Sequence, residues 1–361
     1  AEQTPFIASR TVQLLHDAGI PPEVLHLLPG DGSVGERLVA DHRVDAVMFT
    51  GSTPVGKAVS RQIFDRQGRT GTPVPLVART GGQNAMLVDS SAHAEQVVQD
   101  ILSSAFDSAG QRCSSLRILL IQEDCADHVL ELLKGAIQDL AIGNPARLST
   151  DIGPIISPEA RTEAMDHIEM MRRAGRTVWS PELGENCRYG HFLPPTLIEI
   201  GRVADIPHEV FGPVLHVRRF NRSEMDGVID AVNSMGYGLT FGVHSRVAMT
   251  VDRTTNRIQA GNIYVNRAIT GAVIGSQPFG GSGLSGCGPK AGGPFALRRM
   301  SARTSPWFAP KDANPGSIPR HAQSLVTFLE SRDAVSARQI RQDIAHAMTG
   351  FSMTLPGPAG E

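Results

Sequence analysis

The stretch FTGSTPVG, residues 49–56, joins an apolar segment at residues 45–49 to an amphipathic segment at residues 54–65. This order predicts a strand, a glycine turn and a helix, with Pro54 at the first helical position. Glycines in such a turn let backbone amides approach a pyrophosphate, and a helix N-terminus favours negative charge. The motif departs from the usual G-x-G-x-x-G fingerprint, so taken alone it favours an ordinary strand–turn–helix.

Strands and helices alternate on both sides of this turn. Further strands are predicted at residues 24–28, 75–78, 84–88, 117–122, 214–220, 240–244 and 262–265. Further helices are predicted at residues 7–18, 34–40, 93–105, 125–140, 158–174, 223–233 and 247–257. This alternation predicts an α/β fold with parallel strands and crossover helices.

The composition narrows the class of protein. With 361 residues, the chain is long enough for two domains that each bury a core. Lys and Arg number 34 and Asp and Glu 36, a balance that argues against a nucleic-acid partner or a polybasic membrane contact. Four cysteines indicate free thiols in a reducing, cytoplasmic compartment. We expect no membrane span and no metal.

A second motif, FDSAGQRCS at residues 106–114, places Cys113 on a turn that follows a helix. Beside Arg112, the pKa of such a thiol would be lowered, and the thiolate would act as a nucleophile. An inert buried thiol is the plainer alternative. The sequence therefore offers Cys113 as a candidate nucleophile, without deciding between the two.

Two later motifs are weak when each is taken alone. EVFGPV, residues 209–214, has a Glu before a strand, which is typical of a solvated turn. Glu209 could instead accept hydrogen bonds from ribose hydroxyls. QPFGG, residues 277–281, lies in a Gly-rich loop and is typical of an ordinary surface loop.

Together and in this order, the four motifs resemble the aldehyde dehydrogenase superfamily over about residues 1–294. The resemblance implies a Rossmann-like NAD-binding sheet plus an α/β catalytic domain. It implies oxidation of an aldehyde through a thiohemiacetal and a thioester on Cys113. It implies NAD contacts from Glu2, Gly51, Ser52, Gly56, Thr80, Gly81, Glu209 and Phe211, and substrate contacts from Ser114, Gly271, Ala272 and Phe279.

Three more segments narrow the resemblance: TGGQNA at residues 80–85, SAFDSAGQRC at residues 104–113 and GCGPKAGGP at residues 286–294. They are similar to the dehydrogenase domain of the bifunctional proline utilisation A family. This similarity implies oxidation of L-glutamate γ-semialdehyde to glutamate in proline catabolism. It also implies a proline dehydrogenase domain, with its FAD, elsewhere in a longer polypeptide, and a homo-oligomer. A dehydrogenase of another semialdehyde and a non-catalytic NAD-binding domain are the alternatives.

Arg79 breaks the resemblance. The superfamily has its general-base Glu at this position, whereas a guanidinium stays protonated and offers no acceptor. Arg79 therefore cannot activate the deacylating water, although its charge would lower the pKa of Cys113. The superfamily's strand-loop with an oxyanion-binding Asn and a ribose-binding Lys has no counterpart in the chain. We therefore expect an N-terminally truncated domain with impaired activity and marginal stability.

The resemblance implies four parts along the chain. Residues 1–110 are expected to belong to the NAD-binding domain and residues 111–245 to the catalytic domain. Residues 246–294 are expected to return to the NAD-binding domain and to supply the substrate anchor loop. Residues 295–361 are expected to form an appendage, with a helix at residues 334–347.

Overall fold

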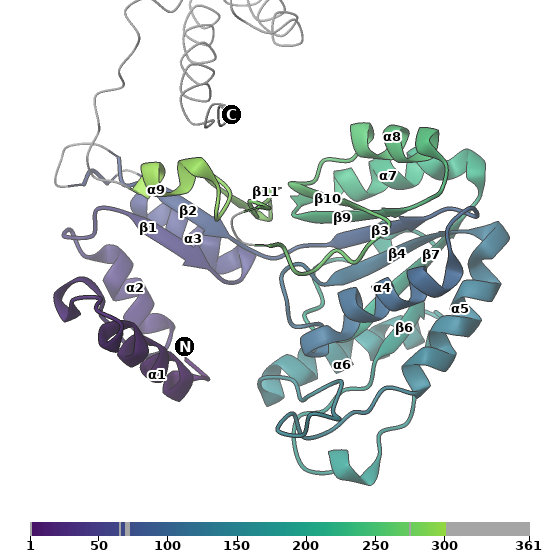
Figure 1. Cartoon of the computed structure of the whole chain (residues 1–361), viewed down its shortest axis with the longest axis horizontal. Helices are drawn as coiled ribbons and strands as arrows, with labels where there is room; N and C mark the ends of the chain where they lie inside the picture. The colour runs from purple at the N-terminus through teal and green to yellow at the C-terminus, as the bar shows by residue number, and fades with distance from the viewer. Residues whose placement is uncertain (1, 65, 69–72, 274–275, 301–361) are drawn as a thin grey trace, which may run out of the picture. The chain divides into compact units, whose positions relative to one another are not determined.

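The computed structural model describes residues 2–64, 66–68, 73–273 and 276–300. Within these residues, the chain forms a three-stranded sheet, order β1-β2-β12, and a seven-stranded sheet, order β10-β9-β3-β4-β7-β6-β5 (Figure 1). We call them the small sheet and the large sheet. The mixed, mostly parallel α/β fold is the predicted one.

The small sheet contains β1 (Val47–Thr50), β2 (Leu76–Arg79) and β12 (Gly286–Cys287). β1 is parallel to β2, and β12 is antiparallel to β2. The large sheet contains β3 (Asn84–Val88), β4 (Leu116–Gln122), β5 (Val178–Trp179), β6 (Thr196–Glu199), β7 (Val214–Phe220), β9 (Thr240–His244) and β10 (Asn262–Val265). All its pairs are parallel except β5 with β6. A separate antiparallel pair joins β8 (Tyr237–Gly238) to β11 (Ser282–Gly283).

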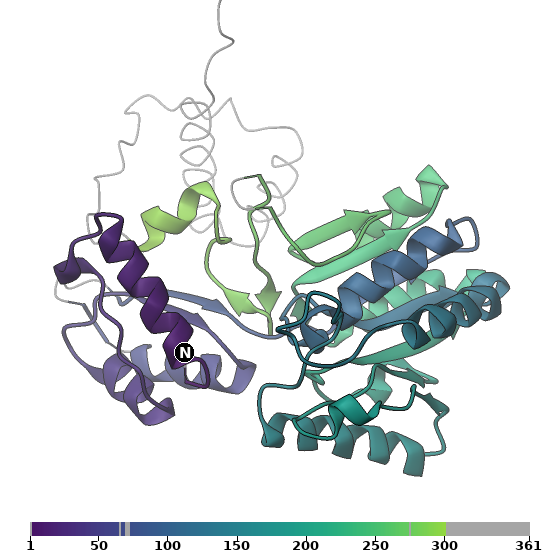
Figure 2. The same cartoon turned by 60° about the horizontal axis from the view of Figure 1, so that its bottom comes forward.

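Helices connect these strands. α1 (Pro5–Asp17), α2 (Gly32–Ala40) and α3 (Thr53–Ile63) belong with the small sheet, and α9 (Pro294–Met300) follows β12. The large sheet has α4 (Ala94–Phe106), α5 (Glu123–Gln138), α6 (Pro158–Arg173), α7 (Met225–Ser234) and α8 (Ala248–Arg257). α4 and α5 pack side by side over one face of this sheet (Figure 2), and α7 packs with α8. Right-handed crossovers place α7 and α8 on the other face.

The core of the molecule is in the large sheet. Every residue of β3 and β4 is buried, because helices cover both faces of a parallel sheet. The small sheet has a minor core of Val47, Val59, Ile63 and Val74. Neither α1 nor α2 has a buried residue.

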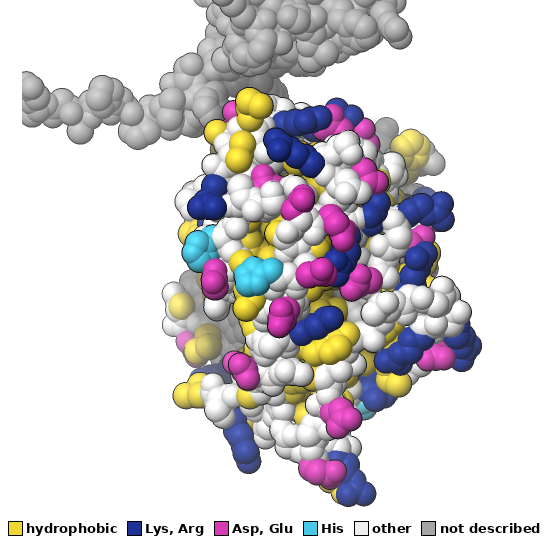
Figure 3. Space-filling model, turned by 90° about the vertical axis from the view of Figure 1, so that its right-hand side faces the viewer, with side chains coloured by type: hydrophobic (Ala, Val, Ile, Leu, Met, Phe, Trp, Pro, Cys, Tyr) yellow, Lys and Arg dark blue, Asp and Glu magenta, His cyan; other side chains and the backbone are white. Residues whose placement is uncertain are grey.

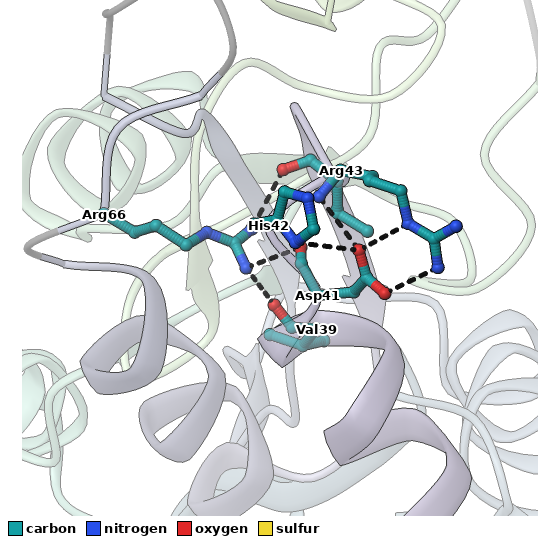
Figure 4. Close-up of polar contacts among 6 residues, drawn as sticks. Val39, Asp41, His42, Arg43 and Arg66 are labelled. Carbon is teal, nitrogen blue, oxygen red and sulfur yellow. Dashed lines mark hydrogen bonds and ion pairs between the residues drawn. The ribbon is translucent and has the colours of Figure 1, made fainter.

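A partly buried arginine, Arg66, links the loop after α3 to the end of α2 and the segment that follows it. The Arg66 guanidinium donates hydrogen bonds to the carbonyls of Val39, Asp41 (3.1 Å) and Val44 (3.0 Å) (Figure 4). The Val39 carbonyl lies at the end of α2 and the other two lie between α2 and β1, whereas Arg66 follows α3. One side chain thus ties two loops that the sequence separates by more than 20 residues.

The outer surface carries charges of both signs. On the face shown in Figure 3, Asp and Glu side chains are interspersed with Lys and Arg, in line with the net charge of -2. In the part of the chain that the structure describes, no helix has the length and apolar character needed to cross a bilayer. The same residues hold no cluster of three or more His, Cys, Asp or Glu suited to a metal ion.

One prediction of secondary structure is wrong, and two strands of the large sheet were missed. The expected strand at residues 24–28 is instead a short 3₁₀ helix, Pro22–Val24, followed by extended backbone. That segment pairs with none of the described strands, so its apolar character alone does not make it part of a sheet. Conversely, β5 and β6 were not predicted, because two and four residues are too short to establish a period.

The sheets also divide the chain differently from the expected boundaries at residues 110 and 245. The small sheet ends at Arg79, and β3 already pairs with β4 and β9 in the large sheet. β10, expected to return to the NAD-binding part, pairs with β9, and of the later strands described only β12 returns. The turn at residues 80–83 therefore separates the two sheets. The expected helix at residues 334–347 lies outside the described residues.

Candidate active site

The Cys113 turn is built on strained backbone. Ser108 and Ala109 have φ values of 55° and 54°, which non-glycine residues seldom adopt. Gly110 follows with φ 66°, and a Cβ on it would lie 2.2 Å from the Gly212 carbonyl oxygen. Only glycine fits there, so the Cys113 turn packs directly against the turn of the EVFGPV motif.

The turn at residues 80–83 also lies against these residues. A Cβ on Gly81 would meet the Glu209 carboxylate at 1.7 Å, and one on Gly82 would lie 2.9 Å from the Cys113 carbonyl. Asn84 Nδ2 donates to the carbonyls of Cys113 (2.7 Å) and Ser115 (2.8 Å). Asn84 was quoted within TGGQNA but not identified as a site residue, and the structure shows that it fixes the Cys113 turn.

Glu209 is not the solvated residue that its motif alone favours. Its side chain is 15% exposed and forms an ion pair with Arg117 at 3.6 Å. Burial raises the pKa of Glu209, whereas Arg117 and the Gly82 amide lower it. Among the described residues, no hydrogen-bond donor reaches its Oε1. Glu209 Oε1 is therefore a buried acceptor whose ion-pair partner, Arg117 Nη2, lies beyond hydrogen-bond distance.

The pKa of Cys113 is raised, not lowered as predicted. Burial is the main cause, and the Glu209 carboxylate adds to it, while Arg117 acts in the opposite direction. Arg112 does not serve the thiol as predicted, because its Nε donates to Ser108 Oγ at 3.0 Å.

Arg79 likewise does not act on Cys113 as predicted. Its guanidinium donates to the carbonyls of Ala78 (3.4 Å), Cys287 (3.3 Å) and Pro289. Burial lowers the pKa of Arg79, and the charge of Cys287 raises it. The thiol that interacts with Arg79 is therefore Cys287 and not Cys113. Arg79 therefore fastens β2 to the loop around β12 and supplies no acceptor to the site.

The glycine turn before α3 lies against Thr80. Ser52 caps the helix by accepting a hydrogen bond from the Val55 amide. A Cβ on Gly56 would lie 2.7 Å from Thr80 Cγ2, and one on Gly51 would lie 2.5 Å from the Phe49 ring. The structure thus brings Gly56 and Thr80 together, whereas Glu2 lies exposed before α1.

A cavity of about 370 Å³ opens next to Ser114, the residue after Cys113. It is lined by Ser114, Ala272, Gln277, Phe279, Ala291 and Gly292. Three of the predicted substrate contacts lie in it, and the fourth, Gly271, directly precedes a lining residue. Ala291 was missed as a site residue, although it lies in the quoted segment at residues 286–294. It exchanges two backbone hydrogen bonds with Phe279, at 2.9 and 2.8 Å.

These features match one family. The profile described as the aldehyde dehydrogenase family matches residues 1–305. The chain therefore belongs to the aldehyde dehydrogenase family, and the fold and the resemblance inferred from the motifs are confirmed.

Curated relatives narrow the comparison. The bifunctional protein PutA of Klebsiella aerogenes is 49% identical, and the match covers 100% of this chain and 29% of PutA. The 1-pyrroline-5-carboxylate dehydrogenase of Geobacillus kaustophilus (strain HTA426) is 35% identical, over 84% of this chain and 59% of that protein. The chain thus spans less than a third of the PutA relative's length.

Solved structures similar to this chain include the same two kinds of protein. A crystal structure of bifunctional proline utilization A (PutA) is 46% identical with a TM-score of 0.79, covering 83% of this chain and 30% of that one. The 1-pyrroline-5-carboxylate dehydrogenase from Thermus with bound NAD is 33% identical with a TM-score of 0.74, covering 81% and 56%.

Proposed function

We propose that this chain carries the nucleophile and the substrate pocket of an NAD-dependent dehydrogenase that oxidises L-glutamate γ-semialdehyde to glutamate. The observation that carries the proposal is the convergence of Cys113 and Glu209 on the turn at residues 80–83, with a 370 Å³ cavity lined by Ser114, the residue after Cys113. The similarity to proteins named PutA and 1-pyrroline-5-carboxylate dehydrogenase supports this substrate class.

The residues present fit NAD. Glu209 Oε1 is a buried acceptor without a donor among the described residues, as a carboxylate that binds ribose hydroxyls would be. The N-terminus of α3, with its cap at Ser52, suits the pyrophosphate. We therefore expect Gly51, Ser52 and Gly56 to hold the phosphates, and Glu209 and Phe211 to hold the nicotinamide end. When bound, NAD supplies the hydride acceptor.

The chain's own residues supply the covalent steps. The Cys113 thiol loses its proton, and its sulfur attacks the aldehyde carbon to form a thiohemiacetal. Loss of hydride from that carbon leaves a thioester on Cys113, which water then hydrolyses to the acid. Ser114 and the amides around Gly271 and Ala272 would donate hydrogen bonds to the substrate's carboxylate, with Phe279 against its aliphatic part.

Hydrolysis is the step that this chain performs poorly. A general base removes the proton of the attacking water and typically contributes about 100- to 10,000-fold in rate. The guanidinium of Arg79 cannot accept that proton, and it is engaged with three carbonyls. We therefore expect acylation of Cys113 to outpace deacylation.

The test is rapid mixing of the protein with NAD and the semialdehyde while absorbance at 340 nm is followed. We expect a burst of at most one NADH per Cys113, followed by slow turnover. Cys113→Ala should abolish the burst, whereas Cys125→Ala, which alters a half-buried thiol in α5, should not. Absence of any burst in a folded protein that binds NAD would favour the non-catalytic alternative.

Substrate choice sharpens the test. Hexanal lacks the carboxylate that would pair with Ser114 and the Gly271 and Ala272 amides, so those donors would stay unsatisfied. We expect kcat/KM for hexanal to be lower by about ten- to a thousandfold. Equal values for both aldehydes would contradict this assignment of the cavity.

The larger context is also proposed. The 29% coverage of PutA supports a proline dehydrogenase domain in the same longer polypeptide, with FAD confined to that domain. We also propose a cytoplasmic homo-oligomer. Light scattering on the longest expressed polypeptide would measure the number of subunits, and cell fractionation would locate it.

A further inference from the structure

A charged side chain occupies the interior of the large sheet next to the nucleophile. Arg117 lies in β4, four residues after Cys113, and is 0% exposed. A fully buried guanidinium is costly unless its donors are satisfied and its charge is paired. Its partners therefore indicate what Arg117 does.

Those partners belong to the two turns of the site. Arg117 Nη1 donates to the Gly212 carbonyl at 3.0 Å, and Nη2 donates to the Arg112 carbonyl at 3.1 Å. Nη2 also lies 3.6 Å from Glu209 Oε1. The guanidinium carbon lies 5.3 Å from the centre of the Phe211 ring. One fork thus joins the turn before Cys113 to both predicted nicotinamide contacts.

The charge of Arg117 also acts on the thiol. It lowers the pKa of Cys113 and of Glu209, against the effect of burial on each. The two other cations near the motif are engaged elsewhere, Arg112 with Ser108 and Arg79 with the loop around β12. The buried cation and the buried carboxylate therefore act on the pKa of Cys113 in opposite directions.

We propose that Arg117 is a positioning residue that holds Glu209 and Phe211 against the Cys113 turn and supplies the positive charge beside the thiol. This proposal rests on the proposed function only in taking Cys113 as the nucleophile. Its readout is the ionisation of Cys113 without NAD or aldehyde. A protein with no dehydrogenase activity would therefore refute the proposed function and leave the role of Arg117 measurable.

The experiment measures the rate of iodoacetamide alkylation of Cys113 against pH in the whole chain, with the modified cysteine identified by peptide mass spectrometry. Arg117→Met removes the charge and the fork while keeping most of the volume. We expect the midpoint of Cys113 alkylation to rise by about one pH unit, the usual effect of losing a nearby opposite charge. The midpoints of Cys125 and Cys287 should stay in place.

Arg66→Met is the matched control. Arg66 is also a partly buried arginine whose guanidinium donates to backbone carbonyls, but its partners lie at the end of α2 and in the loop that follows it (Figure 4). Its loss should lower the melting temperature without moving the Cys113 midpoint. An equal shift in Arg66→Met and Arg117→Met would show general loosening and overturn the proposal.

A double variant tests the pairing with Glu209. Glu209→Gln alone should lower the Cys113 midpoint, because the carboxylate raises the pKa of the thiol. In the Arg117→Met background the same change should have a smaller effect, since Glu209 without its cation is more readily neutral. Additive shifts would mean that Arg117 and Glu209 act independently, which contradicts the proposal.

Because the loss of a buried arginine can prevent folding, a second variant that disturbs the structure less is also measured. Arg117→Gln removes the charge but retains amide donors for the carbonyls of Gly212 and Arg112. We expect the same direction of shift in this variant, and Arg117→Lys, which keeps the charge, should shift the midpoint by less than half as much. An unmoved midpoint in folded Arg117→Gln would overturn the proposal.

Discussion

The two sheets follow the same alternation of strand and helix but differ in how much they bury. β4 of the large sheet has all seven residues buried, whereas Met48 of β1 is 63% exposed. α4 buries Val97 and Ile101, but α1 has no buried residue and leaves Phe6 90% exposed. Sequence periodicity therefore identifies elements, while the number of covering layers determines how strongly each is held.

The site lies where these two regions meet. Arg79 is the last residue of β2 in the small sheet, and Asn84 begins β3 in the large sheet. The Cys113 turn is thus held by the strongly buried sheet, and Gly51, Ser52 and Gly56 lie in the weakly buried region. We expect the predictions below to affect the two regions unequally.

The largest expected effect is on the core of the large sheet. Leu119, in the middle of β4, is 0% exposed, so Leu119→Ala should lower the free energy of unfolding by about 2–5 kcal/mol. Met48→Ala, in β1, should lower it by less than about 0.5 kcal/mol, as expected of a surface position. Urea unfolding followed by circular dichroism measures both. Equal losses would contradict the difference between the sheets.

The next largest effect is on turnover. Arg79→Glu returns an acceptor to the end of β2, and we expect steady-state NADH formation to rise by about 100-fold. Arg61→Glu is the control, because it makes the same charge change at an exposed position of α3. This variant should leave turnover unchanged. Fast multiple turnover in the unaltered chain would show that another residue is the base.

How far the sequence predicts this site depends on which contacts are local. Cys113 and Glu209 were found because their motifs are contiguous. Arg117 was missed, because an arginine in a strand is ordinarily read as facing solvent, and Gly212 and Glu209 reach it only after folding. The sequence also could not predict where the Arg79 side chain points, because two of the carbonyls that hold it lie 208 and 210 residues further along the chain.

The fold shows the same limit. The long amphipathic helix α5 and the mostly apolar strand β4 were predicted correctly, because each pattern extends over enough residues to be recognised. β12 has two residues and no period, yet its pairing with β2 decides which sheet the end of the Gly-rich loop joins. The division between the two sheets differs from the expected boundary at residue 110 for the same reason: the pairing between strands, and not the local sequence pattern, decides which sheet a strand joins.

A buried histidine pair should make the large sheet sensitive to acid. His216 Nδ1 lies 3.0 Å from the Arg117 carbonyl and therefore carries the proton, so His167 Nε2 donates to His216 Nε2 at 2.8 Å. Burial lowers the pKa of His167 to about 4 and of His216 to about 3, from 6.5. The unfolded chain therefore binds these protons more readily.

The stability from this pair is complete above about pH 6.5 and is lost as the pH falls toward 4. We expect His167→Gln, whose amide can still donate to His216, to reduce the loss of unfolding free energy between pH 7 and 5 by about 1–2 kcal/mol. His128→Gln, on the exposed side of α5, is the control. An unchanged pH profile in His167→Gln would show that the pair does not titrate with folding.

The smallest expected effect compares one helix cap from each region. Ser157 accepts from the Ala160 amide at 3.2 Å at the start of α6, and Ser52 accepts from the Val55 amide at 3.5 Å at the start of α3. Ser157→Ala should cost about 1 kcal/mol, the usual value of an N-cap. Ser52→Ala should cost less, because its hydrogen bond is at the distance limit and α3 packs on a minor core.

Amide hydrogen exchange distinguishes the effects of Ser157→Ala and Ser52→Ala, because it measures the opening of each region separately. Ser157→Ala should raise exchange in α6 and in the sheet it covers, whereas Ser52→Ala should raise it in α3, β1 and β2 and leave β3, β4 and β7 unchanged. This confinement is the consequence of the two sheets sharing few contacts beyond the turn at residues 80–83 and the Arg79 loop. If Ser52→Ala instead raised exchange throughout β4, the two sheets would open as one cooperative unit, and their unequal burial would not translate into unequal stability.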